Sequence, residues 1–398
     1  MGALRAVIAN ARLLAAACAL AAAGCAGPLG GSGHGAINGS ASGLSSTDAE
    51  VWTRAPMRLQ LLGTATLSRA ADGPRRDLGG ISGLDYDPAS DTWFLLSDDR
   101  SERAPARFYL ARIALDERGI GAVDVTGVVA LERSGGASGM PDPEAIRLDP
   151  VDRQLVWSSE GDPRHGGDPF VQVSARDGAF VATWPLPANL RFDPSGRRGA
   201  RPNLTLEGLA FSRDGRSLWM SMEAPLRQDG EPPTLSAGAW TRFSRVARDG
   251  RVLGQFAYPL EPIRSPAEGG QGRADNGVSE LLTTPADTLL VVERSGRETA
   301  GGSFRFSARI FEATAERATD VRQIDALADQ PVRARTTPMR KRLVLDLMAL
   351  GLPHLDNIEG AAWGPRLPNG HRTLMLVSDD NFSPDQVTQL IALEVAAE

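Results

Sequence analysis

The sequence predicts an all-β fold, a β-propeller of four-stranded blades whose ring is closed by pairing of the N- and C-terminal strands. Three observations carry this prediction. A hairpin-like segment recurs five times along the chain, and two further strand-like runs follow each of the first four copies. Gly and Pro together supply 70 of the 398 residues (43 + 27), a share typical of a chain rich in turns.

The recurring segment reads as a β-hairpin. Each copy has a small or acidic residue before a short apolar strand, then a turn rich in Pro, Asp, Asn or Gly, then a second apolar strand that ends in an acidic residue. The copies follow one another at similar intervals, counted from Ser82, Glu144, Glu207, Glu280 and Glu359. Units of this length predict separate blades of one ring.

The strands that complete the blades come next in the chain. After the first four hairpins we expect pairs of strands at residues 107–115 and 122–131, 170–175 and 180–185, 241–247 and 252–258, and 307–313 and 320–324. After the fifth hairpin only residues 387–395 remain, so residues 57–67 are expected to supply the missing strand and remove the open edges. Five blades are favoured. Six stay open if residues 342–350, interpreted as a connecting segment, belong to a further blade.

Acidic residues occupy the same two places in successive hairpins. In a propeller the first strand of each blade lines the channel and the second runs antiparallel to it, so the start of one lies beside the end of the other. The spacing from Glu144 to Glu160 is identical to the spacing from Glu207 to Glu223. The acids expected at one mouth of the channel are Asp98, Asp99, Glu144, Glu160, Glu207, Glu223, Glu280, Glu293, Glu359, Asp379 and Asp380.

Carboxylates gathered at one mouth repel one another, by about 3 kcal/mol for a pair ~6 Å apart in an effective dielectric near ~20. Protonation, arginine partners or a hard cation would relieve this repulsion. Calcium suits a cluster of carboxylates, with another divalent cation as the alternative. A structural alternative stays open as well, in which the acids only accept hydrogen bonds from backbone N–H groups of neighbouring blades.

Two arginines directly follow acids of this set. Arg100 comes after Asp98 and Asp99, and Arg294 comes after Glu293. Because a guanidinium binds phosphate or carboxylate through two parallel hydrogen bonds, both are candidate contacts for a substrate anion. Salt bridges to the neighbouring carboxylates are an equally good interpretation.

Composition excludes several other chemistries. The net charge is −6 (43 − 49), so no basic field exists to bind nucleic acid. The two cysteines are Cys18 and Cys25, both near the N-terminus, which excludes a disulfide framework, a cysteine zinc site and a cysteine nucleophile in the folded body. The four histidines lack metal-binding spacing, and nucleophile motifs such as G-x-S-x-G do not occur.

The N-terminal region predicts export. Residues 1–25 combine early arginines with an apolar run too short to span a bilayer, and they end in small residues before Cys25. This ending resembles the lipobox of bacterial lipoproteins, which implies lipidation at Cys25 and a place in the periplasm or outer membrane of a Gram-negative bacterium. Ordinary signal-peptidase cleavage nearby is the alternative. Residues 26–55 are expected to be a flexible tether and residues 56–398 the propeller domain, with no membrane contact except through the lipid.

The sequence contains the motifs GGISGLDYDP, WFLLSDDR, LEGLAFSRDG and NIEGAAWGPRLPNG, the last followed by LVSDDN. With these motifs the chain resembles a family of bacterial phytase-like proteins that carries the label "esterase-like activity of phytase". The resemblance covers roughly residues 58–396. This family is distantly similar to β-propeller phytases, in which calcium at the channel mouth binds phosphate and activates a water. The resemblance therefore implies a metal site whose candidate ligands are Asp98, Asp99, Glu144, Glu160, Glu207, Glu223, Glu280, Glu359, Asp379 and Asp380, with Arg100 and Arg294 as anion contacts.

The leading hypothesis is an exported, metal-dependent hydrolase of phosphate esters or other esters, with Glu207 or Glu359 as the general base. Its partner would be a small-molecule ester, and we expect a monomer. Two alternatives stay open. One is a lactonase that uses the same acids without an arginine anion site, and the other is a non-enzymatic propeller that binds a ligand or protein at the cell envelope.

Overall fold

The computed structural model describes Trp52 and residues 55–70, 72–135, 139–264 and 272–397. Thr53–Glu398 form one compact unit. The predicted signal peptide with Cys25 lies outside the described residues, as does the predicted tether apart from Trp52 and Ala55. In the described part of the chain, no helix has the length and apolar character needed to cross a membrane.

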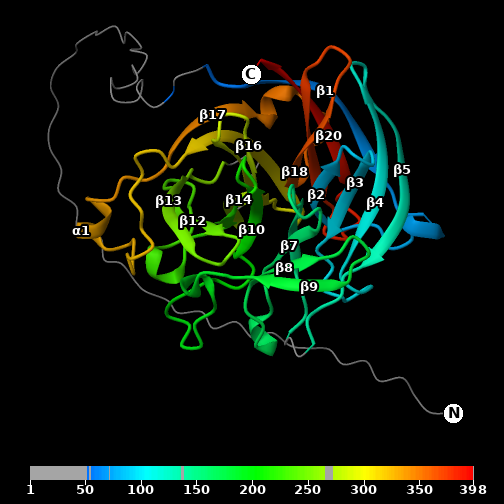
Figure 1. The fold of residues 1–398 in the computed structure, drawn as a ribbon. Helices are drawn as coiled ribbons and strands as arrows, with labels where there is room; N and C mark the ends of the chain where they lie inside the picture. Colours follow the sequence, from blue (N-terminus) through cyan, green and yellow to red (C-terminus); the bar gives the residue numbers. More distant parts are fainter. Residues whose placement is uncertain (1–51, 53–54, 71, 136–138, 265–271, 398) are drawn as a thin grey trace, which may run out of the picture. The chain divides into compact units, whose positions relative to one another are not determined.

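Within the described residues, twenty strands form five antiparallel sheets of four strands each, arranged as a ring (Figure 1). The innermost strands are β2 (Ile81–Asp87), β6 (Pro143–Leu148), β10 (Leu206–Phe211), β14 (Ala274–Thr283) and β18 (Asn357–Arg366). The second strands are β3 (Thr92–Ser97), β7 (Leu155–Ser159), β11 (Ser217–Met222), β15 (Leu289–Glu298) and β19 (Arg372–Asp379). The third strands are β4 (Arg107–Asp116), β8 (Phe170–Ser174), β12 (Ala239–Ala247), β16 (Phe304–Thr314) and β20 (Thr388–Ala397). The outermost strands are β5 (Gly119–Ala130), β9 (Phe180–Trp184), β13 (Val252–Leu260), β17 (Arg340–Asp346) and β1 (Arg58–Leu67).

Short helical turns connect some of these strands. They are the 3-10 turns η1 (Gly73–Arg75), η2 (Pro163–His165), η3 (Ala188–Leu190), η4 (Arg227–Asp229) and η5 (Leu347–Leu350), and the single-turn helix α1 (Gln330–Arg333).

The ring is closed as predicted. Neighbouring blades meet through their innermost strands, since β2 contacts β6 and β18, β10 contacts β6 and β14, and β14 contacts β18. The outermost strand of the last blade is β1, which pairs antiparallel with β20 from Leu59 opposite Val395 to Leu67 opposite Thr388. The five-bladed propeller and its closure by the two ends of the domain are therefore confirmed.

The fourth blade corrects one part of the prediction. Its outermost strand is β17, which pairs with β16, and not residues 320–324. Residues 342–350, the candidate for a sixth blade, fall in β17 and η5, so the described residues form no sixth blade. The charged start of β17 suits this outer position because Arg342 bonds Glu312 on β16 (2.6 Å).

Residues 320–324 lie in a loop over the outside of β13. The N–H of Val321 donates to the carbonyl oxygen of Gln255 (2.7 Å), and the buried Arg242 side chain donates to the carbonyl oxygens of Val321 (3.2 Å) and Ile324 (2.9 Å). A side chain thus satisfies backbone groups that a further strand would otherwise pair. The apolar side chains of this loop pack against Ala257, which gave the run its strand-like appearance in the sequence.

The innermost strands approach one another very closely. A Cβ on Gly83 would lie 2.5 Å from the carbonyl oxygen of Glu144 on β6, and one on Gly208 would lie 2.7 Å from the backbone nitrogen of Leu281 on β14. Glycine is required at both positions because any side chain would push two blades apart. The channel is therefore narrow, and its geometry is set by backbone contacts between blades.

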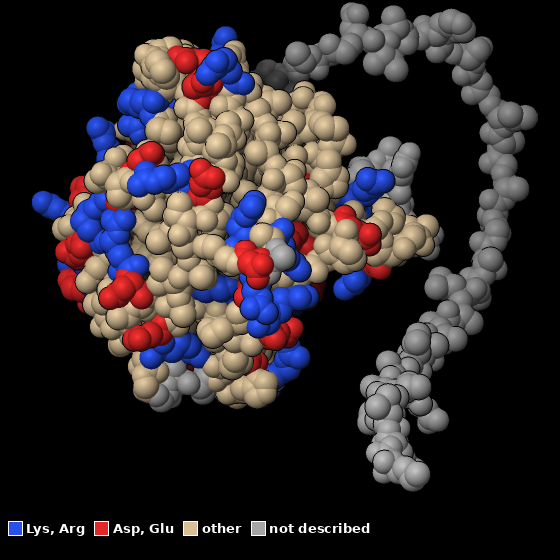
Figure 2. Space-filling model, turned by 90° about the vertical axis from the view of Figure 1, so that its right-hand side faces the viewer, with Lys and Arg blue, Asp and Glu red and all other residues tan. Residues whose placement is uncertain are grey.

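Apolar clusters between blades hold this arrangement. Trp157 on β7 is fully buried with Phe94 and Phe108 of the preceding blade, and its ring meets Phe170 edge-on with centroids 5.2 Å apart. On the flank of the ring seen in Figure 2, basic and acidic side chains are interspersed.

Candidate functional site

A cavity of about 380 Å³ opens where the innermost strands begin and the second strands end. Two positions of each hairpin were predicted to bring acids to this cavity, and in every blade except the fourth an acid at one or both of them lines its wall. These acids are Asp98, Glu144, Glu160, Glu207, Glu223 and Glu359, and the two predicted arginines, Arg100 and Arg294, line the same cavity. Asp379 completes the group through its contact with Asp98 and Glu359.

Strand register explains why these side chains converge. Each innermost strand has an irregularity in its pairing, near the strand start in four blades, for example between Ile81 and Gly83, and in the middle of β14 in the fourth. Such a bulge interrupts the alternation of side chains between the two faces of the sheet and changes the direction of the side chain at the extra residue. The residues at the bulge are Ser82, Glu144, Glu207, Ser279 and Glu359. The matching residues, on the second strands or directly after them, are Asp98, Glu160, Glu223, Arg294 and Asp379.

This register places two acids of the fourth blade elsewhere. Val278 pairs with Glu293, so Ser279 and Arg294 are the equivalents of the acids in the other blades, and Glu280 and Glu293 are each displaced by a single position. Glu280 forms a buried ion pair with Arg147 (2.5 Å) below the mouth cavity. Glu293 accepts a hydrogen bond from the hydroxyl of Tyr258 (2.8 Å) and pairs with Lys341.

Two further predicted acids hold loops. Asp99 pairs with Arg107 (2.7 Å) and accepts bonds from the backbone N–H groups of residues 102, 103 and 104. Asp380 accepts from the backbone N–H groups of Gly80 (2.8 Å) and Phe382 (3.0 Å). For these two carboxylates the geometry matches the structural alternative, in which the acid satisfies backbone donors.

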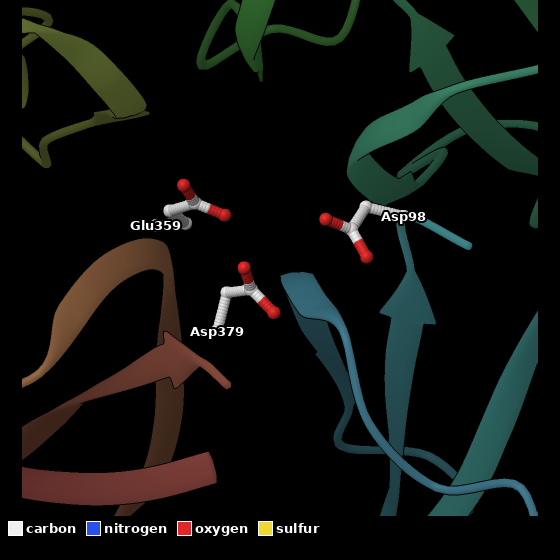
Figure 3. A group of neighbouring side chains, drawn as sticks. All are labelled: Asp98, Glu359 and Asp379. Atoms are coloured by element: carbon white, nitrogen blue, oxygen red, sulfur yellow. The ribbon is translucent and has the colours of Figure 1, made fainter. Parts of the chain in front are cut away.

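The remaining acids, together with Asp142, form three groups, in each of which one carboxylate oxygen per residue lies within 4.8 Å of the others, and the second and third groups share Glu160. The groups are Asp98, Glu359 and Asp379; Asp142, Glu144 and Glu160; and Glu160, Glu207 and Glu223. Figure 3 shows the carboxylates of the first group pointing toward one another from two adjacent blades. This set of oxygen donors fits a hard cation such as calcium.

One atom of the first group strengthens this fit. Asp379 is 1% exposed, and its Oδ1 accepts a hydrogen bond from the N–H of Asn381 (2.8 Å). Its Oδ2 is buried and has no hydrogen-bond donor among the described residues. A buried carboxylate oxygen without a donor costs free energy unless a proton or a cation satisfies it.

Burial and mutual repulsion hold protons at the mouth. Burial first, and then neighbouring carboxylates, raise the pKa of Asp98, Glu144 and Glu207 well above the ordinary values. Burial raises the pKa of Glu223 to about 8 although Arg294 lowers it, and raises the pKa of Asp142 to about 6 although Arg100 lowers it. The carboxyl group of Glu223 is therefore largely protonated at neutral pH, and a cation bound among these acids would displace protons from them.

Both candidate anion contacts form ion pairs with acids of the mouth. Arg294 lies 2.8 Å from Asp275, 3.1 Å from Glu223 and 3.7 Å from Glu359, and these neighbours raise its pKa against the effect of burial. Arg100 lies 2.5 Å from Asp142 and also donates to Asn203. The salt-bridge interpretation therefore describes both arginines in this structure, while both remain on the cavity wall.

Sequence reasoning missed several residues of the cavity. Asp142 and Asp275 supply carboxylates, and Phe382 forms part of the rim with the Arg103 guanidinium 4.5 Å above its ring. The signal for the two acids was their place: each lies at or just before the start of an innermost strand. Phe382 lies in the loop after β19, and it has no counterpart in the other hairpins that could have indicated a place at the cavity.

Fold and site together define a five-bladed β-propeller with an acidic cavity at one channel mouth. The chain belongs to the phytase-like family, described as the esterase-like activity of phytase, whose family profile matches residues 76–382. Among curated proteins, none matches this chain.

Solved structures show only distant similarity. A thermostable family-43 glycoside hydrolase is 11% identical and is matched over 81% of this chain and 91% of its own, with a TM-score of 0.42. A mannose phosphorylase from Leishmania mexicana, solved with a phosphate ion, is 10% identical over 84% and 88%, with a TM-score of 0.38. The catalytic domain of a GH62 α-L-arabinofuranosidase from Coprinopsis cinerea is 9% identical over 85% and 97%, with a TM-score of 0.37. Similarity this distant carries no inference about function.

Proposed function

We propose that this protein is an exported, metal-dependent hydrolase of phosphate esters or other esters that acts at the acidic channel mouth. Family membership supports a phytase-like activity. The observation that carries the proposal is the group Asp98, Glu359 and Asp379, where three carboxylates converge and one buried oxygen has no donor among the described residues.

Asp98, Glu359 and Asp379 are the residues proposed to hold the metal, with calcium as the proposed ion. When bound, such an ion would polarise the phosphoryl or carbonyl oxygen of the substrate and lower the pKa of a nearby water. Asn357 keeps Glu359 in position through a hydrogen bond from its side-chain amide (2.7 Å).

Glu207 is the better placed of the two candidate bases. It belongs to the group with Glu160 and Glu223, apart from the three proposed ligands, so it can exchange a proton with a water in the cavity without being held on the metal. Arg294 lies beside Glu359 and would contact an anionic group of the substrate positioned over the proposed metal site.

The proposal predicts hydrolysis that depends on calcium. With p-nitrophenyl phosphate, p-nitrophenyl acetate and a simple lactone as substrates, we expect turnover of the phosphate ester or the acetate in calcium. We expect the rate to fall at least about tenfold in EGTA, because the metal supplies substrate polarisation and an activated water. Turnover of the lactone alone would favour a lactonase. No turnover of any substrate, with calcium binding intact, would favour a non-enzymatic binding propeller.

We also propose that the mature protein is a lipoprotein attached through Cys25. Replacing Cys25 with Ser is expected to move the protein from the membrane fraction to the soluble fraction and to remove the mass of the acyl chains, since no other anchor is expected. Fractionation with intact-mass spectrometry measures both effects. Membrane association that is unchanged in Cys25→Ser, without an acyl mass in the wild type, would contradict this proposal.

A further inference from the structure

A second and larger cavity, of about 770 Å³, lies at the opposite mouth of the channel, where the innermost strands end. All five blades contribute to its wall, with Tyr86 from β2, Leu148 from β6, Phe211 from β10, Thr283 from β14 and Trp363 from β18. Its volume falls in the range of pockets that bind small organic molecules. Arg147, which lines this cavity, pairs with the buried Glu280 (2.5 Å).

Arginines are the most frequent charged residues in the wall of this second cavity. Among the described residues, five arginines and one carboxylate line it. The arginines are Arg147, Arg153, Arg213, Arg366 and Arg372, and the carboxylate is Asp85, which accepts a hydrogen bond from the N–H of Leu148 (2.7 Å). Arg147 pairs with the buried Glu280 and Arg153 with the buried Asp87, so the attraction for an anion at this concave surface rests on Arg213 and Arg366.

Two of these arginines are exposed and presented at the rim. Arg213 donates to the carbonyl oxygen of Pro285 (2.9 Å), and Arg366 donates to the carbonyl oxygen of Gly370 (2.7 Å). Each of these bonds uses one of the five N–H donors of a guanidinium and fixes the direction of the group. Both side chains can therefore keep their present contact and also bind a carboxylate, sulfonate or phosphate group.

The floor and walls of the cavity are largely apolar. Trp363 is partly exposed, and its Nε1 donates to the carbonyl oxygen of Thr283 (3.0 Å), so its polar atom is satisfied and its ring offers an apolar face. Phe211 and Leu282 line the cavity beside it. The rim contains Pro88, Pro150, Pro285 and Pro365, which follow four of the inner strands or end them and restrict backbone motion.

We propose that this cavity binds a small organic anion, with its carboxylate, sulfonate or phosphate group at Arg213 and Arg366 and its apolar body against Trp363 and Phe211. The binding is independent of the acidic mouth and of the proposed hydrolysis. A bare inorganic anion lacks the apolar body that the wall would bury, and a cation would be repelled by Arg213 and Arg366 at the rim.

The test uses 8-anilinonaphthalene-1-sulfonate, an aromatic sulfonate, titrated into the mature protein and followed by its fluorescence. We expect one saturable site, with affinity reduced at least tenfold in Arg213→Glu and in Arg366→Glu, and reduced also in Trp363→Leu. The matched control is Arg216→Glu, because Arg216 lies in the same turn, is 87% exposed and does not line the cavity. Affinity in Arg216→Glu should stay within twofold of the wild type.

Two further arms separate this site from the acidic mouth and from a simple anion effect. Calcium and EGTA should leave the affinity for the probe unchanged, and inorganic phosphate at millimolar concentration should displace little of it. The proposal is overturned if the probe shows no saturable single-site binding, or if Arg213→Glu and Arg216→Glu reduce its affinity equally. Strong displacement by calcium would also overturn it, since the probe would then be bound at the acidic mouth.

Discussion

Replacing Arg147 with Met is expected to lower the free energy of unfolding by about 3–5 kcal/mol, because it leaves a buried carboxylate without its charged partner. The side chains of Arg147 and Glu280 are 5% and 1% exposed and lie 2.5 Å apart. The guanidinium also donates to the carbonyl oxygens of Leu84 (2.8 Å), Leu209 (2.6 Å) and Leu281 (3.1 Å). One side chain thus links the innermost strands of four blades.

Urea unfolding of Arg147→Met, Glu280→Gln and the double variant measures this effect. Burial raises the pKa of Glu280 to about 7 even with Arg147 beside it, so without Arg147 the carboxyl group takes up a proton at neutral pH. The double variant is expected to be more stable than Arg147→Met alone, since it removes both charges. A single variant within about 1 kcal/mol of the wild type would show that the pair does not hold the blades together.

Glu359→Gln and Asp98→Asn are each expected to weaken calcium binding by at least about tenfold and to lower calcium-dependent hydrolysis accordingly. Each change keeps the shape of the side chain and removes one charge from the group in Figure 3. Glu207→Gln is expected to behave differently. It should keep most of the calcium affinity and lower the hydrolysis rate by roughly 10²–10⁴-fold, as the loss of a general base does.

Calorimetric calcium titration, paired with hydrolysis rates at saturating calcium, distinguishes these two roles. The matched control is Glu231→Gln, since Glu231 is 85% exposed and lies outside the mouth cavity. Equal calcium affinity in Glu359→Gln and Glu231→Gln would remove Glu359 from the proposed ligands. Full hydrolysis by Glu207→Gln would remove Glu207 as the proposed base.

The number of blades and the closure of the ring followed from the sequence because each blade repeats one hairpin with its own turn signals. The same repeat located the acids in the blades where the hairpin has equal length. Glu144 and Glu160 have the same spacing as Glu207 and Glu223, and the structure places all four on the cavity wall. In these two blades the equal spacing of the acids in the sequence corresponds to equal strand pairing in the structure.

The fourth blade shows where such reasoning fails. Matching acid to acid selected Glu280 and Glu293, which stand closer together in the sequence than the paired acids of the other hairpins. Strand pairing instead puts Ser279 and Arg294 in the equivalent places. A shift by a single position moves a side chain to the other face of a strand, and two adjacent polar residues give no hint of which one the bulge presents. Two carboxylates predicted at the mouth, those of Glu280 and Glu293, therefore lie elsewhere in the structure.

Contacts between loops of different blades could not be predicted from the sequence either. Asp142, at the start of the second blade, pairs with Arg100 in a loop of the first, and this contact depends on how two blades pack. A repeat within one blade contains no information about its neighbour. The second cavity was not foreseen for the same reason, since Trp363, Arg213 and Arg366 come together only when the ring closes.

The most direct measurement is a calcium titration of the wild-type mature protein, stripped with EGTA, at pH 6 and at pH 8. We expect saturable binding with release of protons and a higher affinity at pH 8, because burial and neighbouring carboxylates hold the pKa of the proposed ligands Asp98 and Asp379 well above the ordinary value. The melting temperature should rise with calcium, reflecting about 2.7 kcal/mol at a hundred times the dissociation constant. No binding heat, together with a melting temperature indifferent to calcium, magnesium, manganese and EGTA at both pH values, would contradict the proposed metal site.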